Sequence, residues 1–237
     1  MGRNNWFEFK QFRIEQQKAA MKVGTDGVLL GAWIAVGDAC RMLDVGTGTG
    51  LIALMLAQRS LAIIDAIEID DFAFEEARFN FVHSPWSDRL NAVSGDFVSF
   101  SNHPEETYDL IVSNPPFFIN SLKTSDAATT IARHDEKLSF DQLIFGVRRL
   151  LNYHGRLGVI IPFESGVGFR ESARLHGFYL KQWTSVIPKI GKLSKRVLLE
   201  FGLQPCYPVE NKLVILDESG TYTENYKSLT APFYPAF

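Results

Sequence analysis

Short apolar runs rich in β-branched residues alternate with longer segments of helical apolar spacing from residue 41 onward. We predict strands at residues 41–45, 63–69, 90–93, 108–113 and 156–161, with helices at 51–57 and 72–81. Strands that alternate with helices form βαβ units, so the sequence predicts an α/β domain on a mostly parallel sheet. After Pro162 a helix near 168–176 precedes strands near 179–187, 196–202 and 213–216, which favours an antiparallel edge to the sheet.

The overall composition is that of an ordinary globular protein. The chain has 237 residues, of which 46% are hydrophobic, and a net charge of -3, so no general basic excess indicates nucleic-acid binding. Its two cysteines, Cys40 and Cys206, lie far apart without a metal-binding spacing, which predicts neither a zinc site nor a disulfide framework. A cytoplasmic location fits best, because the amino-terminal residues also lack an apolar stretch long enough for a signal peptide or a membrane span.

Residues 1–36 precede the first clear strand and have a character of their own. Aromatic side chains are interleaved there with basic ones, as in Trp6, Phe9, Lys10 and Arg13. We expect this segment to be an extension, a hairpin or a helix, that packs on the domain formed by residues 37–237.

The sequence L-D-V-G-T-G-T-G-L at residues 43–51 puts three glycines at alternate positions between a predicted strand and a predicted helix. Glycines at such a turn let the backbone turn tightly and approach a ligand closely. The dinucleotide fingerprint G-x-G-x-x-G does not fit, because its last glycine falls on Leu51. The loop instead resembles motif I of class I S-adenosylmethionine-dependent methyltransferases. The candidate cofactor-binding residues here are Asp44, Gly46, Gly48 and Gly50.

Carboxylates follow the next two predicted strands. Glu68 ends the second strand, roughly 20 residues after the glycine loop, where a carboxylate can accept both hydroxyls of a ribose. Asp96 follows the third strand in the sequence G-D-F, where this fold commonly places an acceptor for the adenine amino group. Its neighbour Phe97 is expected to pack on the adenine ring. Either acid alone could be an exposed turn carboxylate, but their order after successive strands predicts a nucleoside site.

The fourth predicted strand ends in S-N-P-P-F, and its last four residues resemble motif IV of methyltransferases that modify a planar nitrogen. The lone pair of such an amine is delocalised. Two acceptors, the side-chain oxygen of Asn114 and the carbonyl of Pro115, favour its pyramidalisation and aim the lone pair at the methyl donor. The prolines fix φ and offer no competing NH, and Phe117 supplies a stacking face. The predicted catalytic residues are Asn114, Pro115, Pro116 and Phe117.

Further segments extend the resemblance over nearly the whole chain. They are F-K-Q-F-R-I-E-Q at residues 9–16, M-K-V-G-T-D-G-V-L-L-G-A-W at 21–33 and K-R-V-L-L-E-F at 195–201. With the motifs above, they resemble the bacterial tRNA1(Val) (adenine-N6) methyltransferases, and the segment at 21–33 is the most specific. The resemblance implies an α/β fold of the class I methyltransferase type, with a Rossmann-like, mostly parallel sheet of seven strands and one antiparallel edge strand.

The same resemblance implies an activity and its partners. A methyl group passes from S-adenosyl-L-methionine, which leaves S-adenosyl-L-homocysteine, to the N6 amine of the adenine 3′ of the anticodon in tRNA1(Val). The helix start around Lys22, Thr25 and Asp26 is implied to close over the methionine end of the cofactor, and Asn114 is a candidate cofactor-binding residue as well as a catalytic one. Asp26 is also a candidate N-cap of the following helix. The implied partner is a tRNA anticodon loop, with no membrane, no metal ion and a monomeric enzyme.

A local basic segment offers a surface for RNA in a mildly acidic chain. Residues 181–196 contain no acidic residue. Their basic and aromatic members are Lys181, Lys189, Lys192, Lys195, Arg196 and Trp183. Arg133, beyond the N-P-P-F motif, is a further candidate for an RNA contact.

Other activities use the same tetrapeptide and stay open from the sequence. A glutamine-N5 methyltransferase of release factors and a guanine-N2 methyltransferase of ribosomal RNA share its nitrogen chemistry. A non-catalytic RNA-binding module on the same fold is a third alternative, which the intact set of Asp44, Gly46, Gly48, Glu68 and Asn114 argues against.

Overall fold

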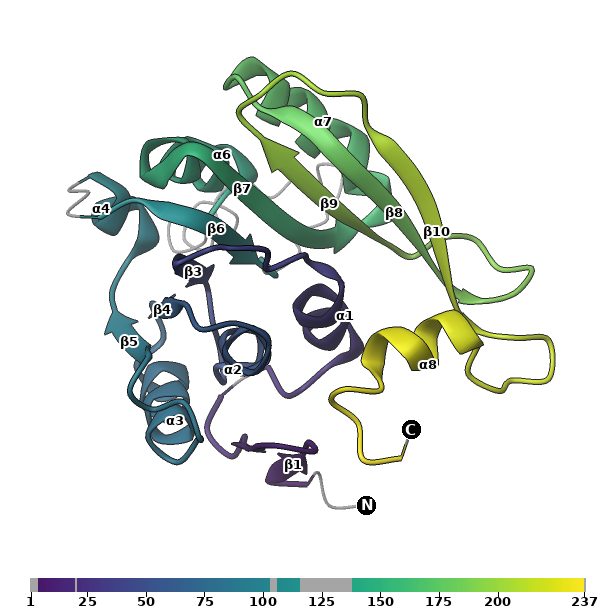
Figure 1. The fold of residues 1–237 in the computed structure, drawn as a ribbon, viewed down its shortest axis with the longest axis horizontal. Coiled ribbons are helices and arrows are strands. Elements are labelled where there is room, and N and C mark those ends of the chain that lie inside the picture. The colour runs from purple at the N-terminus through teal and green to yellow at the C-terminus, as the bar shows by residue number, and fades with distance from the viewer. Residues whose placement is uncertain (1–3, 20, 103–105, 116–137, 237) are drawn as a thin grey trace, which may run out of the picture.

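The computed structural model describes residues 4–19, 21–102, 106–115 and 138–236. Its centre is a single sheet, which in this part of the chain has eight strands in the order β10-β8-β9-β7-β6-β3-β4-β5 (Figure 1). The strands are β3 (Arg41–Val45), β4 (Ile63–Glu68), β5 (Leu90–Ser94), β6 (Tyr108–Ser113), β7 (Leu151–Pro162), β8 (Tyr179–Lys189), β9 (Arg196–Gly202) and β10 (Val209–Leu216).

The α/β class and the mostly parallel sheet are confirmed, with two differences from the implied topology. Among the described strands of this sheet, only β9 runs antiparallel to its neighbours, β7 and β8. It does not form the edge, because β8 lies outside it and β10 adds its backbone hydrogen bonds to β8 in parallel. The implied sheet of seven strands with an antiparallel edge strand is therefore wrong in number and in the position of that strand, whereas each strand read from the apolar pattern forms.

Helices cover both faces of this sheet. They are α1 (Thr25–Trp33), α2 (Leu51–Arg59), α3 (Asp71–Val82), α4 (Phe97–Asn102), α6 (Phe140–Leu150), α7 (Gly166–Leu175) and α8 (Glu224–Thr230), with a short 3₁₀ helix η1 (Phe163–Ser165). Met42 and Leu110 face a core shared with α1, α2 and α8, whereas their neighbours Leu43 and Ile111 face a second core with α4, α6 and α7. Successive side chains of a strand point to opposite faces, which is why these strands read as continuous apolar runs.

Parallel pairing brings the carboxyl ends of four strands to one edge. β3 pairs with β4 and β6, and β4 pairs with β5. In this register Val45 lies opposite both Ile67 and Ser113, and Glu68 lies opposite Ser94. The loops after β3, β4, β5 and β6 therefore meet, as ligand-binding loops do in open α/β sheets.

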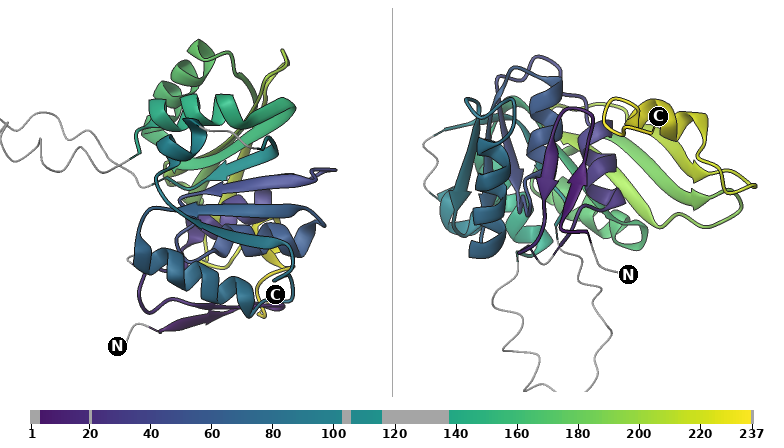
Figure 2. Two further views of the ribbon diagram at one scale, coloured as in Figure 1. Left: turned by 90° about the vertical axis from the view of Figure 1, so that its left-hand side faces the viewer. Right: turned by 90° about the horizontal axis from the view of Figure 1, so that it is seen from below.

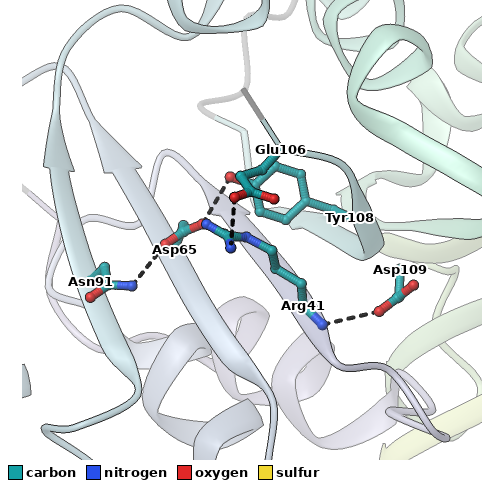
Figure 3. Close-up of polar contacts among 6 residues, drawn as sticks. All are labelled: Arg41, Asp65, Asn91, Glu106, Tyr108 and Asp109. Atoms are coloured by element: carbon teal, nitrogen blue, oxygen red, sulfur yellow. Dashed lines mark hydrogen bonds and ion pairs between the residues drawn. The ribbon is translucent and has the colours of Figure 1, made fainter. Parts of the chain in front are cut away.

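A buried acid ties the strands together at their amino ends (Figure 3). Asp65 on β4 accepts hydrogen bonds from Arg41 on β3 at 2.9 Å, from Tyr108 on β6 at 2.9 Å and from Asn91 on β5 at 3.0 Å. Burial, and then the charge of Asp65, raise the pKa of Tyr108, so its hydroxyl stays a donor. This charge-assisted network fixes the strand order at the edge away from the loops.

The amino-terminal segment forms a hairpin, β1 (Trp6–Glu8) and β2 (Arg13–Glu15), followed by α1. Phe9 and Phe12 stack at 4.6 Å between ring centroids and belong to the core shared with α1 and α2. Lys10 reaches the carboxyl-terminal tail, where its backbone NH donates to the carbonyl of Phe233 at 2.8 Å. Phe9 and Phe12 therefore pack in the core and leave no ring face for RNA.

We predict opposite effects for two helical glycine substitutions. A Cβ at Gly146 in α6 lies 2.5 Å from Cε1 of Phe97, so Gly146→Ala should lower the free energy of unfolding by about 1–3 kcal/mol. A Cβ at Gly168 in α7 meets nothing within 4 Å, so Gly168→Ala should raise it by about 0.4–1 kcal/mol. Urea denaturation followed by circular dichroism measures both, and equal changes would contradict the close contact between α4 and α6.

Candidate active site

The glycine loop between β3 and α2, residues 46–50, is called the glycine cradle here. It is open on one side and tightly packed on the other. Gly46, Gly48 and Gly50 have φ values of 70°, 58° and 84°, which L side chains rarely adopt. A Cβ at Gly46 or Gly48 meets nothing within 4 Å, whereas one at Gly50 lies 2.4 Å from the ring of Phe81. The first two glycines therefore leave room for a ligand, and the third lets the loop pack on α3.

Asp44, just before this cradle, is fully buried. Its Oδ2 accepts hydrogen bonds from the Thr47 hydroxyl at 2.6 Å and the Ala53 NH at 3.2 Å. Its Oδ1 has no donor among the residues that the structure describes. Burial raises the pKa of Asp44 to about 7, against the lowering effect of the two hydrogen bonds. The unpaired Oδ1 leaves this carboxyl able to accept a further hydrogen bond, which is strongest when the group is ionised and the donor is cationic.

Glu68 is held rigidly at the end of β4. Its Oε2 accepts from the Gly48 NH at 2.8 Å, and its Oε1 accepts from the NH groups of Ile69 and Asp70 at 2.9 and 3.0 Å. Each carboxylate oxygen has more than one lone-pair site, so the group can accept further hydrogen bonds. The acid therefore both shapes the glycine loop and presents acceptors beside it.

Of the two predicted site residues after β5, Asp96 lies at the surface and Phe97 lies in the core. Asp96 is exposed, and its Oδ2 accepts from the Ser99 NH at 2.8 Å in the first turn of α4. The ring of Phe97 is 5% exposed and lies in the core against Gly146. The structure thus commits this ring to packing between α4 and α6, which leaves Asp96 as the member of the pair at the open edge.

Asn114 and Pro115 follow β6 directly beside the cradle. The Ser113 hydroxyl donates to the Val45 carbonyl at 2.8 Å and joins this strand end to β3. Oδ1 of Asn114 is shielded from solvent and finds no hydrogen-bond donor within the described ranges. Pro115 is buried. Pro116, Phe117 and Arg133 lie outside the described residues.

The start of α1 reaches the same edge. Asp26 is not the N-cap, which is Gly24; its carboxylate instead pairs with Arg196 at 2.8 Å, and Arg196 lies opposite Pro162 at the carboxyl end of β7. Thr25 is the exposed first residue of the helix. The Nζ of Lys22 donates to the carbonyl of Asn4 at 3.1 Å, so this side chain contacts the amino-terminal segment.

Two buried polar residues of α3, which the sequence interpretation missed as site residues, hold the amino-terminal segment. Glu76 accepts from three successive NH groups, those of Gln17, Lys18 and Ala19, at 2.5, 2.9 and 2.8 Å. The only sequence signal for it was a charged residue on an apolar helix face.

Asn80 is the second of these residues and is 2% exposed. It exchanges hydrogen bonds with the backbone of Glu15 at 2.9 and 3.0 Å. It also donates to the Thr49 carbonyl of the glycine loop at 2.9 Å. Asn80 thereby connects the hairpin to the candidate cofactor cradle.

The basic segment 181–196 divides between two ends of the sheet. Lys181 is the third residue of β8 and packs against Gly202, about 26 Å from Lys189 at 3.3 Å per residue. Lys189 ends β8, and Lys192 and Lys195 lie exposed in the turn that follows. Trp183 packs against Gly166 and Phe163. The predicted basic surface is therefore smaller than the sequence suggested and lies at the carboxyl edge.

The residues that the structure describes offer neither a metal site nor a membrane-spanning helix. No group of three or more His, Cys, Asp or Glu side chains in that part of the chain is placed to hold a metal ion. None of its helices combines the length and the apolar character that crossing a membrane requires.

Comparison with known proteins identifies the family to which the chain belongs. Residues 23–160 match the family model of the methyltransferase small domain. The chain is 45% identical over 97% of both chains to the tRNA1(Val) (adenine(37)-N6)-methyltransferase of Bacteroides fragilis, and 42% identical over 99% of both to that of Aeromonas hydrophila.

Solved structures show the same fold at low sequence identity. A predicted O-methyltransferase of Agrobacterium tumefaciens aligns over 88% of this chain and 96% of its own, with a TM-score of 0.70 and 19% identity. A glycopeptide N-methyltransferase complexed with S-adenosylmethionine aligns over 78% of this chain and 90% of its own, with a TM-score of 0.53 and 13% identity. The fold is therefore that of class I methyltransferases, and the chain belongs to the tRNA1(Val) (adenine(37)-N6)-methyltransferase family.

Proposed function

We propose that the protein transfers a methyl group from S-adenosyl-L-methionine to the N6 amine of the adenine 3′ of the anticodon in tRNA1(Val). The observation that carries this proposal is the shielded oxygen of Asn114, which lacks a donor among the described residues and stands beside the glycine cradle. A buried acceptor without a donor costs about 1–3 kcal/mol, and an amino group of the substrate supplies the missing donor.

The residues around the cradle fit the proposed cofactor, which supplies an electrophilic sulfonium methyl when bound. Asp44 offers its unpaired Oδ1 to the ammonium of the methionine moiety. Glu68 accepts from the ribose hydroxyls, and the exposed Asp96 accepts from the adenine amino group. Gly46, Gly48 and Gly50 let the backbone come close to the ligand, and Lys22 and Thr25 close the site from the α1 side.

Asn114 and Pro115 act on the amine to be methylated. The Asn114 oxygen and the Pro115 carbonyl each accept one amino hydrogen, which directs the nitrogen lone pair away from the base ring. Pro116 stiffens this backbone and Phe117 stacks on the base. In-line positioning is the main requirement of methyl transfer, so no strong general base is needed.

The proposed partner is the anticodon loop of a tRNA. An unpaired loop base costs less to splay into a pocket than a base in a duplex. The exposed Lys192 and Lys195 stand at the same edge of the sheet as Asn114, where they can bind loop phosphates. We further propose a monomeric cytoplasmic enzyme in which residues 1–36 extend a single methyltransferase domain formed by residues 37–237.

We predict that Asn114→Ala abolishes methyl transfer while cofactor affinity stays nearly unchanged, because the amide acts on the target amine. The assay is transfer from labelled S-adenosylmethionine to unmodified total tRNA, with nucleoside analysis by mass spectrometry and calorimetry of S-adenosylhomocysteine binding. N6-methyladenosine in a valine tRNA supports the function. Label in a release factor or in ribosomal RNA would assign the chain to one of the other activities, and retained turnover would remove Asn114 from catalysis.

The two ends of β8 provide a matched charge test. Lys192→Ala with Lys195→Ala should weaken binding of an anticodon stem-loop and reduce its salt dependence by about 0.7 in log–log slope for each lost phosphate contact. Lys181→Ala, at the opposite end of the strand, should leave the slope unchanged. Fluorescence anisotropy over a range of KCl concentrations measures both, and equal slopes in all variants would place the RNA elsewhere.

Cofactor affinity should depend on pH through Asp44. Its raised pKa of about 7 means that the free protein holds the carboxyl protonated below that pH, whereas an ammonium ligand needs the carboxylate. S-adenosylhomocysteine should therefore bind more tightly as pH rises towards 7, by up to about tenfold per unit, and level off above it.

Asp44→Asn is the control for this pH dependence, because its side chain does not ionise and its binding should be weaker and flat with pH. Methylthioadenosine, which lacks the ammonium, should show no dependence in either protein. A pH dependence that survives in Asp44→Asn would assign the titration to another group. Isothermal titration calorimetry between pH 5.5 and 8 distinguishes these outcomes.

A further inference from the structure

A cavity of about 870 Å³ lies outside the site described above, between the β1–β2 hairpin and α3. The hairpin runs beside this helix, as Figure 2 shows, and α3 follows Glu68 by only three residues. The volume falls in the range of small-molecule and cofactor sites. It is therefore large enough for a nucleotide.

Each wall of this cavity presents an aromatic ring that is not used in the core. Trp6 of β1 is 43% exposed, with the guanidinium of Arg13 at 4.2 Å from its ring centroid. Phe79 of α3 is 49% exposed and stacks on His83 at 4.0 Å between centroids. Exposed rings in a concave surface offer stacking faces for a base, since every base has a π-face.

The charges around the cavity do not repel a phosphate. Glu15 pairs with Arg13 at 2.9 Å, and Glu75 pairs with Arg78 at 2.6 Å. The third carboxylate, Glu76, is 5% exposed and accepts from three backbone NH groups. Lys18 adds a positive charge to the lining, and the amides of Asn4, Asn5 and Gln17 can bond to base edges.

The hairpin wall is hydrogen bonded to the proposed active site. Asn80 joins the backbone of Glu15, which lines the cavity, to the Thr49 carbonyl in the glycine loop. Lys22, just before α1, donates to the carbonyl of Asn4 in the same lining. Both contacts join the cavity wall to elements that carry the proposed active site.

We propose that this cavity is a second RNA-binding site, which stacks an unpaired nucleotide of the substrate on Trp6 and Phe79. The inference rests on the proposed action on RNA. It assigns the amino-terminal hairpin a role in substrate binding, although its rings at Phe9 and Phe12 are in the core. The shared chemistry also fits a free nucleotide, which the test separates from RNA.

Trp6→Ala and Phe79→Ala are each expected to raise the Kd for an unmodified tRNA transcript by about tenfold, the loss of one stacked base. Trp6→Phe keeps a ring and should recover most of the affinity. Phe145→Ala is the matched control, since this ring is 51% exposed but belongs to α6, which packs in the core on the other face of the sheet. Fluorescence anisotropy measures Kd, and circular dichroism melting checks that each variant folds.

Three further readouts separate this inference from a structural effect and from the proposed function. Affinity for S-adenosylhomocysteine should be unchanged, and methyl transfer should lose kcat/KM through a higher KM with kcat retained. Cross-linking of 4-thiouridine-containing tRNA should label peptides within residues 4–18 or 75–83.

The possible results each decide the question. Wild-type tRNA methylation together with unchanged Kd values in both Ala variants overturns the second site and leaves the function standing. Absence of any tRNA binding by the wild type overturns both. AMP that binds in the cavity and protects these peptides while the tRNA Kd stays unchanged in the variants replaces RNA with a free nucleotide as the occupant and overturns the proposal.

Discussion

The parallel alignment of β3, β4, β5 and β6 is the constraint on which the rest of the molecule depends. Backbone hydrogen bonds fix the register, so that Val45, Glu68, Ser94 and Ser113 end at one edge. Asp65 holds the other ends with donors from β3, β5 and β6. Polar side chains that are up to 70 residues apart in sequence, from Asp44 to Asn114, can then act on one ligand without any contact between them.

The buried polar face of α3 adds a second level of organisation. Between β2 and α1, Glu76 supplies acceptors for three backbone NH groups of the amino-terminal segment. A buried carboxylate is tolerated when it is fully hydrogen bonded, and here that requirement fixes where the segment lies. Asn80 makes the same helix a support for the glycine loop, so the position of the hairpin and the shape of the cradle depend on one another.

Much of this arrangement could be predicted from local pattern. Strand positions follow from runs of β-branched residues, and the order of Asp44, Glu68, Asp96 and Asn114 along the chain follows from the repeat of strand and helix. The strand order at the far edge could not be predicted, because local sequence pattern does not determine which open edge of the sheet β10 pairs with. The motif position of Phe97 predicts a contact with the ligand, whereas its ring packs in the core against Gly146, where a larger residue would clash with it.

Long-range polar pairs were the other limit of prediction. The pairing of Asp26 with Arg196 joins residues 170 apart, and no local rule distinguishes it from the helix cap that Asp26 was expected to provide. The division of the basic segment has a similar cause, because a strand of 11 residues carries its ends to opposite edges. Basic residues that are close in sequence form one surface only where the chain between them is not an extended strand.

An unsatisfied buried oxygen does not by itself mark a binding site. In the described part of the chain, Gln58 has one as well as Asp44 and Asn114, yet its amide nitrogen holds the Pro232 carbonyl, as expected of a structural contact. Asp44 and Asn114 differ because they lie at adjacent strand ends, beside glycines where a side chain would meet open space. A buried acceptor costs about 1–3 kcal/mol when no donor meets it. Burial of these two oxygens therefore favours ligands that bring amino groups to both positions.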